Sequence, residues 1–169
     1  MTIEVGSRLP DATLRESIEF GAACPIAPNP VSVTEASRGK RIVIFGLPGA
    51  YTSTCSAQHV PSYLESYDAL KQKGVDEIWC VSVNDGYVMA AWGREQKALG
   101  KIRFLGDGAA EFATKLGLTR DLTSSGMGIR MQRCSLLVQD GVVKSLHVEA
   151  PGKFEVSDAA TMLKDLAAV

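Results

Sequence analysis

The sequence has few residues of the kinds that hold metal ions. Histidine occurs twice, and the four cysteines are scattered along the chain without a CxxC motif. These residues are His59 and His147, and Cys24, Cys55, Cys80 and Cys134. Structural zinc sites pair their ligands at short spacings. We therefore expect neither a metal nor another cofactor, and we expect the cysteines to be free thiols in a reducing compartment.

Long apolar runs and an excess of one charge are also absent. No apolar run approaches the roughly 20 residues that span a bilayer, and the first residues, MTIEVGSRLPD, lack the basic and apolar regions of a secretory signal. Lysine and arginine number 18 against 19 aspartates and glutamates, and the basic residues form no stripe. A nucleic-acid-binding face needs such a stripe. We expect a cytoplasmic protein with no nucleic-acid or membrane partner.

The length and composition are those of one globular domain. The chain has 169 residues, of which 46% are hydrophobic and 22% charged, and domains usually contain roughly 100–200 residues. A chain of this size buries enough surface to fold without a disulfide or a metal. No linker-like stretch divides it, so we predict a single domain over residues 1–169.

Apolar runs and turn residues predict the order of the strands. Turn formers dominate residues 1–38, where alternating stretches such as 31–34 predict short, partly irregular strands. The apolar run 41–47 predicts a fully buried strand that ends at Pro48. Further strands are predicted over residues 77–83, 102–105, 135–139 and 142–148, the last two as a hairpin around Asp140-Gly141.

Helical periodicity fills the gaps between these strands. One helix is predicted over residues 52–73, with a kink at Pro61. A second follows Gly86 and carries Val88, Met89, Trp92 and Leu99, and a third ends at about Leu116. A last helix follows the capping pair Ser157-Asp158. Strands that alternate with helices argue for a sheet covered on both faces. The sequence therefore predicts an α/β, thioredoxin-like fold: a central mixed sheet flanked by helices, with N-terminal strand additions.

The segment with the clearest chemical signal is GLPGAYTSTCS, residues 46–56. It places Cys55 in the first turn of the helix that follows the buried strand, where unpaired N–H groups and the helix dipole stabilise a thiolate. Thiol pKa values fall from about 8.5 to about 3.5–7.5 in such settings. The Thr52 hydroxyl can cap this helix and face the sulfur. Taken alone, these residues fit a helix cap beside a small core cysteine equally well.

The spacing Pro-x-x-x-Thr-x-x-Cys, formed by Pro48, Thr52 and Cys55, resembles the active-site motif of the peroxiredoxins, thiol peroxidases of the thioredoxin superfamily. Residues 42–56, 73–92 (KGVDEIWCVSVNDGYVMAAW) and 133–149 (RCSLLVQDGVVKSLHVE) are similar to the peroxiredoxin-5, or type II, subfamily. Ser53 stands where many members have proline, a departure that alters no atom of the mechanism. The resemblance implies an antioxidant enzyme that reduces hydrogen peroxide and organic hydroperoxides, and a homodimer with its contact near the active-site loop.

The resemblance also implies a role for each residue of the motif. Cys55 is the peroxidatic nucleophile, which passes through a sulfenic acid, and the Thr52 hydroxyl holds a peroxide oxygen. Pro48 shields the sulfenic acid from water and overoxidation. Arg133 supplies the cation that stabilises the thiolate and the departing oxygen. Arg130 is the alternative cation, and otherwise an ordinary solvated charge.

Four further features receive less specific interpretations. We expect His59 to pack and hydrogen-bond beneath the site rather than act as a base, and His147 to be structural. Residues 126–128 (GMG) predict a mobile loop and not a dinucleotide fingerprint. Cys134 follows Arg133 on a strand, so its side chain points to the opposite face and makes it a poor partner for Cys55.

The return of the sulfenic acid to the thiol leaves two possibilities open. Cys80 matches the position of a second cysteine in plant-like type II members, yet it lies in the predicted buried strand 77–83, so a resolving role and an inert thiol are equally compatible with the sequence. We expect glutathione, glutaredoxin or thioredoxin as reductant, with direct attack on oxidised Cys55. A disulfide reductase and a redox-regulated binding protein remain as alternatives, although the first normally uses CxxC.

Overall fold

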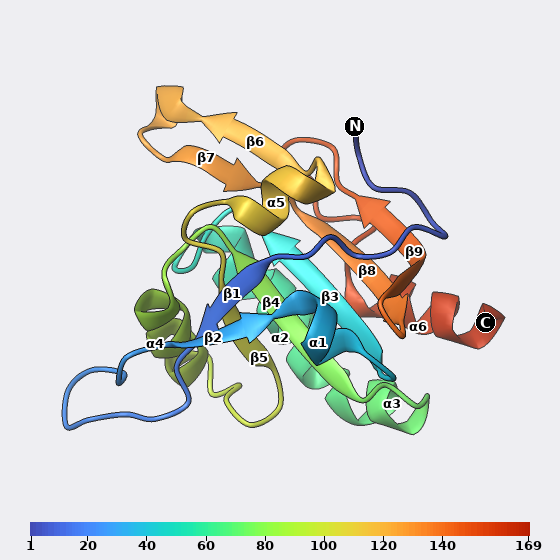
Figure 1. The fold of residues 1–169 in the computed structure, drawn as a ribbon, viewed down its shortest axis with the longest axis horizontal. Helices are drawn as coiled ribbons and strands as arrows, with labels where there is room; N and C mark the ends of the chain where they lie inside the picture. Colours follow the sequence, from blue (N-terminus) through green and yellow to red (C-terminus); the bar gives the residue numbers. More distant parts are fainter.

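A seven-stranded mixed sheet runs through the molecule in the computed structural model, which describes residues 1–169. The strand order is β2-β1-β5-β4-β3-β8-β9. The strands are β1 (Thr13–Glu16), β2 (Asn29–Ser32), β3 (Arg41–Leu47), β4 (Glu77–Ser82), β5 (Arg103–Gly106), β8 (Cys134–Gln139) and β9 (Val142–Val148). β3, β4 and β5 are parallel, and β8 runs antiparallel to β3 (Figure 1). The predicted mixed sheet with N-terminal additions is confirmed.

Helices cover both faces of this sheet (Figure 1). They are α1 (Val33–Ser37), α2 (Val60–Glu65), α3 (Tyr67–Gln72), α4 (Gly86–Glu95), α5 (Glu111–Leu116) and α6 (Ala159–Ala168), and a π-helical segment, η1 (Cys55–His59), leads into α2. Residues of α2, α3, α4 and α6 join one hydrophobic cluster, and residues of α1 and α5 join a second. No helix combines the length and apolarity that crossing a membrane requires.

The continuous apolar character of β3 follows from these two layers. Val43 and Phe45 belong to the first cluster, whereas Ile42 and Ile44 belong to the second. Successive side chains of a strand point to opposite faces, so a strand covered on both sides needs an apolar residue at every position. β3 is therefore held rigidly at the centre of the sheet, and its carboxyl end is a fixed platform for the loop that follows.

Two predicted boundaries are wrong. Residues 31–34 were predicted as strand, but α1 begins at Val33, because the Ser32 side chain accepts a hydrogen bond from the Glu35 N–H and caps a helix there. The helix after Gly86 was extended to Leu99, but α4 ends at Glu95. Leu99 lies beyond it and is 38% exposed.

A second, two-stranded sheet was not predicted. β6 (Thr119–Leu122) pairs antiparallel with β7 (Gly128–Met131), and a 3₁₀ turn, η2 (Thr123–Ser125), connects them. The two strands project from one end of the molecule (Figure 1). Gly126 and Gly128, assigned to a mobile loop from the sequence, adopt positive φ angles of 74° and 69° where the chain turns back into β7. The short polar strands lack the apolar alternation that would have revealed them.

Candidate active site

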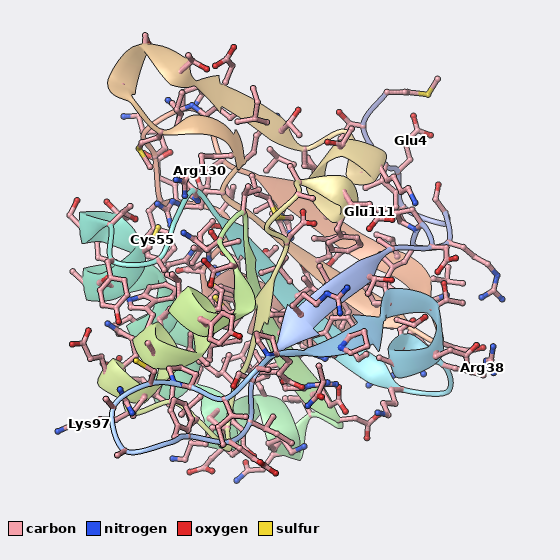
Figure 2. The ribbon with its side chains drawn as sticks, turned by 60° about the vertical axis from the view of Figure 1, so that its left-hand side comes forward. Glu4, Arg38, Cys55, Lys97, Glu111 and Arg130 are labelled. Carbon is pink, nitrogen blue, oxygen red and sulfur yellow. The ribbon has the colours of Figure 1, made fainter.

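Cys55 lies beyond the carboxyl end of β3, where a short loop leads into η1. Ligands of open α/β sheets bind at the carboxyl ends of the strands. Cys55 is the first residue of η1, and its side chain is fully buried. Figure 2 shows it on the same side of the molecule as Arg130, near the meeting point of this loop and β7. The cysteine therefore stands in the first helical turns after a buried strand, as predicted.

The loop before Cys55 is held by the neighbouring strand. The Ala50 N–H donates to Asn84 Oδ1 at 3.0 Å, and the Ser82 hydroxyl donates to the same oxygen at 2.7 Å. Tyr51 adopts a left-handed φ of 61° at the tip of the loop. Asn84 was not among the predicted site residues, although its position just after β4, beside the carboxyl end of β3, is the signal that could have indicated it.

The Thr52 hydroxyl does not cap the helix. It donates to the carbonyl oxygen of Gly49 at 2.7 Å, and η1 has no side-chain cap. The capping prediction is wrong because no helical N–H donates to the Thr52 hydroxyl oxygen. A hydroxyl that has donated its proton keeps lone pairs. Towards a ligand, Thr52 is therefore an acceptor.

A π-helical turn that begins at Cys55 directly precedes Pro61. The Val60 N–H reaches the carbonyl oxygen of Cys55, the spacing that defines a π-helix. Pro61 follows in the first turn of α2, within helical backbone that runs without a break from Ser53 to Glu65. The expected helix over 52–73 is therefore confirmed in its extent but not in its regularity: η1 and α2 form one unbroken helical stretch that contains Pro61, and Ser66 separates it from α3.

Arg133 is brought directly to the cysteine. Its Nη2 lies 3.2 Å from Cys55 Sγ, and its Nη1 lies 3.0 Å from His59 Nδ1. Arg133 immediately precedes β8, whose first residue, Cys134, pairs with Gly46 of β3. Cys134 belongs to the second hydrophobic cluster while Cys55 belongs to the first, so the two cysteines lie on opposite faces, as predicted.

His59 is a neutral imidazole that positions Arg133. Burial and the adjacent Arg133 charge lower the pKa of His59 from 6.5 to about 3. A guanidinium only donates, so Nδ1 accepts from Arg133, and Nε2 carries the proton and donates to the Ser157 carbonyl oxygen at 3.1 Å. The Tyr63 hydroxyl donates to the same carbonyl at 2.8 Å. His59 therefore packs and hydrogen-bonds beneath the site, as predicted.

Glu149 fixes the loop that supplies this carbonyl. Its Oε1 accepts from the N–H groups of Glu155, Val156 and Ser157 at 2.7, 2.7 and 2.8 Å, and from the Ser157 hydroxyl at 2.9 Å. Burial acts to raise the pKa of Glu149, but these hydrogen bonds outweigh burial and leave it below its ordinary value. No local sequence signal indicates this role, because its partners are defined only by the folded loop.

Arg130 has neither of the two roles considered from the sequence, a cation beside Cys55 or a solvated charge. Its guanidinium donates to the carbonyl oxygens of Met127 at 2.8 Å, Val83 at 3.2 Å and Pro48 at 3.3 Å. These contacts join β7 to the loops that follow β3 and β4. Arg133, not Arg130, is the arginine that contacts Cys55. Arg130 is a structural clamp on the loop that contains Pro48.

The other cysteines differ from Cys55 in their surroundings. Cys80 lies in β4, is fully buried in the same hydrophobic cluster, and burial raises its pKa well above 9.0. Burial also raises the pKa of Cys134 to about 12. Cys24 is exposed in the N-terminal segment. Neither buried cysteine has an arginine within hydrogen-bond distance of its sulfur.

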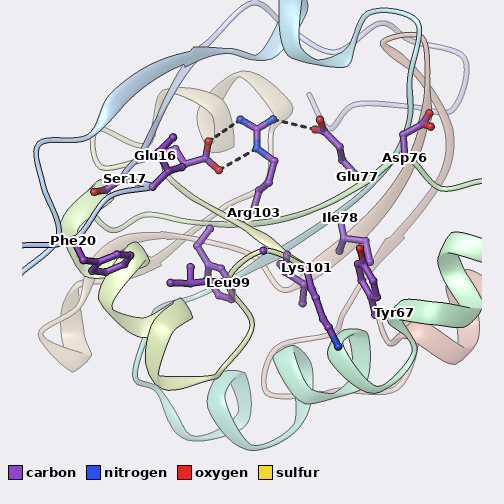
Figure 3. A pocket seen from close by; sticks show the side chains of 14 residues that line it. Glu16, Ser17, Phe20, Tyr67, Asp76, Glu77, Ile78, Leu99, Lys101 and Arg103 are labelled. Carbon is purple, nitrogen blue, oxygen red and sulfur yellow. Dashed lines mark hydrogen bonds and ion pairs between the residues drawn. The ribbon is translucent and has the colours of Figure 1, made fainter.

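Two cavities lie at opposite ends of the sheet. One, of about 220 Å³, borders the site and is lined by residues that include Pro48, Thr54 and Arg133. The other, of about 420 Å³, opens at the amino ends of β4 and β5. Figure 3 shows Arg103 in this larger cavity between Glu16 and Glu77, which satisfy its charge. Of the predicted site residues, Pro48 and Arg133 thus line the smaller of these two cavities.

Comparison with known proteins identifies the family. Residues 4–163 match the Redoxin family. Peroxiredoxin-2B of Arabidopsis thaliana is 42% identical over 167 residues, which are 97% of this chain and 98% of that protein. The chloroplastic Peroxiredoxin-2E-2 of Oryza sativa subsp. japonica is 44% identical over 98% of this chain and 73% of its own length.

Solved structures are similar over the same length. A Burkholderia cenocepacia protein described as a putative thioredoxin reductase has a TM-score of 0.92 at 56% identity, over 97% of this chain and 98% of its own. Reduced Prx3 of Vibrio vulnificus in complex with hydrogen peroxide has a TM-score of 0.89 at 44% identity, covering 98% and 99%. Peroxiredoxin 5 of Alvinella pompejana has a TM-score of 0.85 at 29% identity, covering 99% of each. The chain therefore belongs to the Redoxin family and, within it, to the peroxiredoxins, which are thiol-dependent peroxidases with an antioxidant role.

Proposed function

We propose that this chain reduces hydrogen peroxide and organic hydroperoxides through a sulfenic acid at Cys55. The observation that carries the proposal is the 3.2 Å contact between Arg133 Nη2 and Cys55 Sγ. A guanidinium at this distance favours the thiolate, which is the nucleophilic form of cysteine. Cys55 is the one cysteine of the chain whose sulfur has such a partner.

The first step is a displacement at oxygen. Cys55 Sγ attacks the terminal oxygen of the peroxide, the S–O bond forms as the O–O bond breaks, and the departing oxygen takes a proton and leaves as water or an alcohol. Arg133 stabilises the charge that passes from sulfur to the departing oxygen. Thr52 accepts a hydrogen bond from the peroxide, because its own proton is held by Gly49. Pro48, at the rim of the adjoining cavity, limits access to the sulfenic acid.

The second step returns the sulfenic acid to the thiol. A reducing thiol attacks oxidised Cys55, which forms a mixed disulfide and releases water, and a second thiol then breaks this disulfide. We propose glutathione with glutaredoxin, or thioredoxin, as the donor, in a reducing cytoplasm. The high pKa of buried Cys80 supports an external donor, because a protonated thiol is a poor nucleophile.

We also propose that two copies associate near the active-site loop. Tyr51, at the tip of this loop, is 53% exposed, and its ring lies 6.4 Å from that of buried Trp92. Large aromatic side chains are enriched in protein interfaces. Sedimentation of the reduced protein measures the assembly directly, and a monomer at all concentrations would contradict it.

The test of the catalytic proposal is Cys55→Ser. This substitution keeps the size of the side chain and removes the thiolate, so peroxide consumption with excess thiol falls to background while the far-ultraviolet circular dichroism is unchanged. Cys24→Ser, at an exposed position away from the site, is the control and retains turnover. Substantial turnover by Cys55→Ser contradicts the proposal. If the wild-type protein consumes about one equivalent of peroxide and then stops despite excess thiol, it is a redox sensor rather than a peroxidase.

A further inference from the structure

The cavity beside Cys55 is larger than hydrogen peroxide requires. Its volume is about 220 Å³, whereas a water molecule occupies about 30 Å³ of the liquid. Cavities for whole drug-sized ligands measure about 300–1,000 Å³. The space therefore has room for one arm of a larger reactant, and Arg133, which lines it, lies 3.2 Å from Cys55 Sγ.

The cavity wall is polar, and its charged residues are mainly cations. Only one of its ten lining residues is hydrophobic, and Arg120, Arg133 and Lys153 face a single carboxylate, Glu149. Arg133 is engaged by Cys55 and His59, as described above. Arg120 and Lys153 make no ion pair and no side-chain hydrogen bond.

Glu149 does not neutralise these two cations. Its Oε1 is occupied by three backbone N–H groups and the Ser157 hydroxyl, and its carboxylate makes no salt bridge within 4.0 Å. Arg120 comes from β6 and Lys153 from the loop between β9 and α6. Two cations from distant segments of the chain thus line one cavity, and neither forms an ion pair with the single carboxylate there.

We propose that this cavity is a carboxylate-binding subsite, in which Arg120 and Lys153 hold the anionic end of a reactant whose other end reacts at Cys55. The inference rests on the proposed sulfenic acid chemistry. Arginine presents a planar fork of donors that matches a carboxylate, and lysine adds a point charge. The reactant is either a carboxylate-bearing hydroperoxide, which oxidises Cys55 in the first step, or a carboxylate-bearing thiol, which reduces the sulfenic acid in the second.

The first arm of the test measures oxidation of reduced Cys55. Stopped-flow kinetics compare tert-butyl hydroperoxide with a tertiary hydroperoxide of similar size that ends in a carboxylate. In wild type, the ratio of the charged to the neutral rate falls when salt is raised from about 0.1 to 1 M, because the Debye length shrinks from about 10 to 3 Å. Arg120→Gln and Lys153→Gln each lower this ratio by about three- to fivefold.

The second arm measures reduction of the sulfenic acid, prepared with one equivalent of hydrogen peroxide. The thiols are 3-mercaptopropionate, which is anionic, and 2-mercaptoethanol, which is neutral. Each thiol forms the mixed disulfide with release of water. Because the same two thiols react with wild type and with each variant, their intrinsic reactivities cancel when the two rate ratios are compared. The same two variants lower the anionic-to-neutral ratio by about three- to fivefold.

The outcomes separate the two sources and the two hypotheses. A ratio that falls in one arm assigns the subsite to the oxidant or to the reductant, and a fall in both assigns it to both. Lys144→Gln, an exposed cation in β9 outside the cavity lining, is the matched control and leaves both ratios unchanged. Ratios that are insensitive to salt and to both variants overturn the subsite. Failure of wild type to form any sulfenic acid overturns instead the proposed function.

Discussion

A single arginine carries two contacts that define the site. Arg133 lies between Cys55 Sγ and the unprotonated Nδ1 of His59. Because burial keeps His59 neutral, it accepts from the guanidinium without adding a competing positive charge. His59 therefore orients Arg133 towards the sulfur of Cys55 and leaves the charge of the guanidinium uncontested by a second cation.

Replacement of this arginine tests its electrostatic role. Arg133→Met keeps an unbranched apolar stem but removes the guanidinium and its charge, and a hydrogen bond to a charged group is worth about 1.5–3 kcal/mol. We expect the rate of peroxide attack at neutral pH to fall by about one to two orders of magnitude. Thiolate absorbance in the ultraviolet, followed against pH, should show less thiolate in the variant at every intermediate pH. Identical titrations for wild type and variant would mean that another group stabilises the sulfur.

Cys80 is expected to be dispensable. Burial keeps its thiol protonated, and it lies inside β4, so attack on Cys55 would require local unfolding. Cys80→Ser should retain turnover with glutathione and glutaredoxin as donors, and the assay is repeated with thioredoxin alone. Cys134→Ser, equally buried in the other cluster, is the control. If Cys80→Ser is inactive with every donor, an intramolecular disulfide is obligatory and direct attack by an external thiol is wrong.

The residues of the candidate site differ in how far the sequence could predict their contacts. Pro48, Thr52 and Cys55 share one short motif, so their proximity follows from local spacing alone. Arg133 was named through family resemblance, and its contact with Cys55 is made by the pairing of β8 with β3. Glu149 and Ser157 act through backbone groups of a loop. Backbone contacts of this kind leave no pattern of residue types, so no sequence argument reached them.

At the scale of elements, one side chain ties three segments together. Arg130, on β7, donates to carbonyl oxygens in the loops after β3 and β4 and in its own turn. β6 and β7 contribute no hydrogen-bonded strand to the main sheet. The small sheet is thus anchored to the active-site loop through this guanidinium.

Loss of the Arg130 contacts should loosen the active-site loop without removing the Arg133 charge beside Cys55. Arg130→Met leaves three carbonyl acceptors without their charged donor, and we expect a loss of about 1.5–3 kcal/mol in the free energy of unfolding. The peroxidase rate should fall less than in Arg133→Met, because Arg133 still contacts Cys55. Arg38→Met, which removes an exposed pair with Glu35, is the control and should change stability by less than about 1 kcal/mol. Urea unfolding and steady-state turnover measure the two effects, and equal stability of both variants would contradict the clamp.

The elements that were predicted correctly are those with strong apolar patterns. β3, β4, β8 and β9 are apolar runs or flank a two-residue turn, and their bounds differ little from those expected. Over residues 52–73 the periodicity predicted the helical extent but not the hydrogen-bond register: a π-helical turn stands before α2, and Ser66 interrupts the helix before α3. Polar β6 and β7 escaped because they are short and only partly buried.

At the scale of the whole molecule, the buried imidazole links the site to global stability. His59 is fully buried among Phe45, Tyr63 and Phe154. Its pKa is about 3 in the folded chain, against 6.5 as its ordinary value. Between these values the unfolded chain binds a proton that the folded chain excludes. Stability is therefore full above pH 6.5 and falls as the pH decreases towards 3.

This linkage gives a measurable slope. From pH 7 to pH 5 the free energy of unfolding should fall by about 2 kcal/mol through His59 alone. His59→Asn places an amide where Nδ1 was and removes the titration, so its stability, although lower at pH 7, should lose about 2 kcal/mol less over the same interval. Carboxyl groups contribute equally to both proteins and cancel in the difference. Urea unfolding at half-unit pH steps measures it, with His147→Asn as the control for the other imidazole. Parallel pH profiles for wild type and His59→Asn would show that His59 is not held neutral, and the neutral acceptor beneath Arg133 would have to be abandoned.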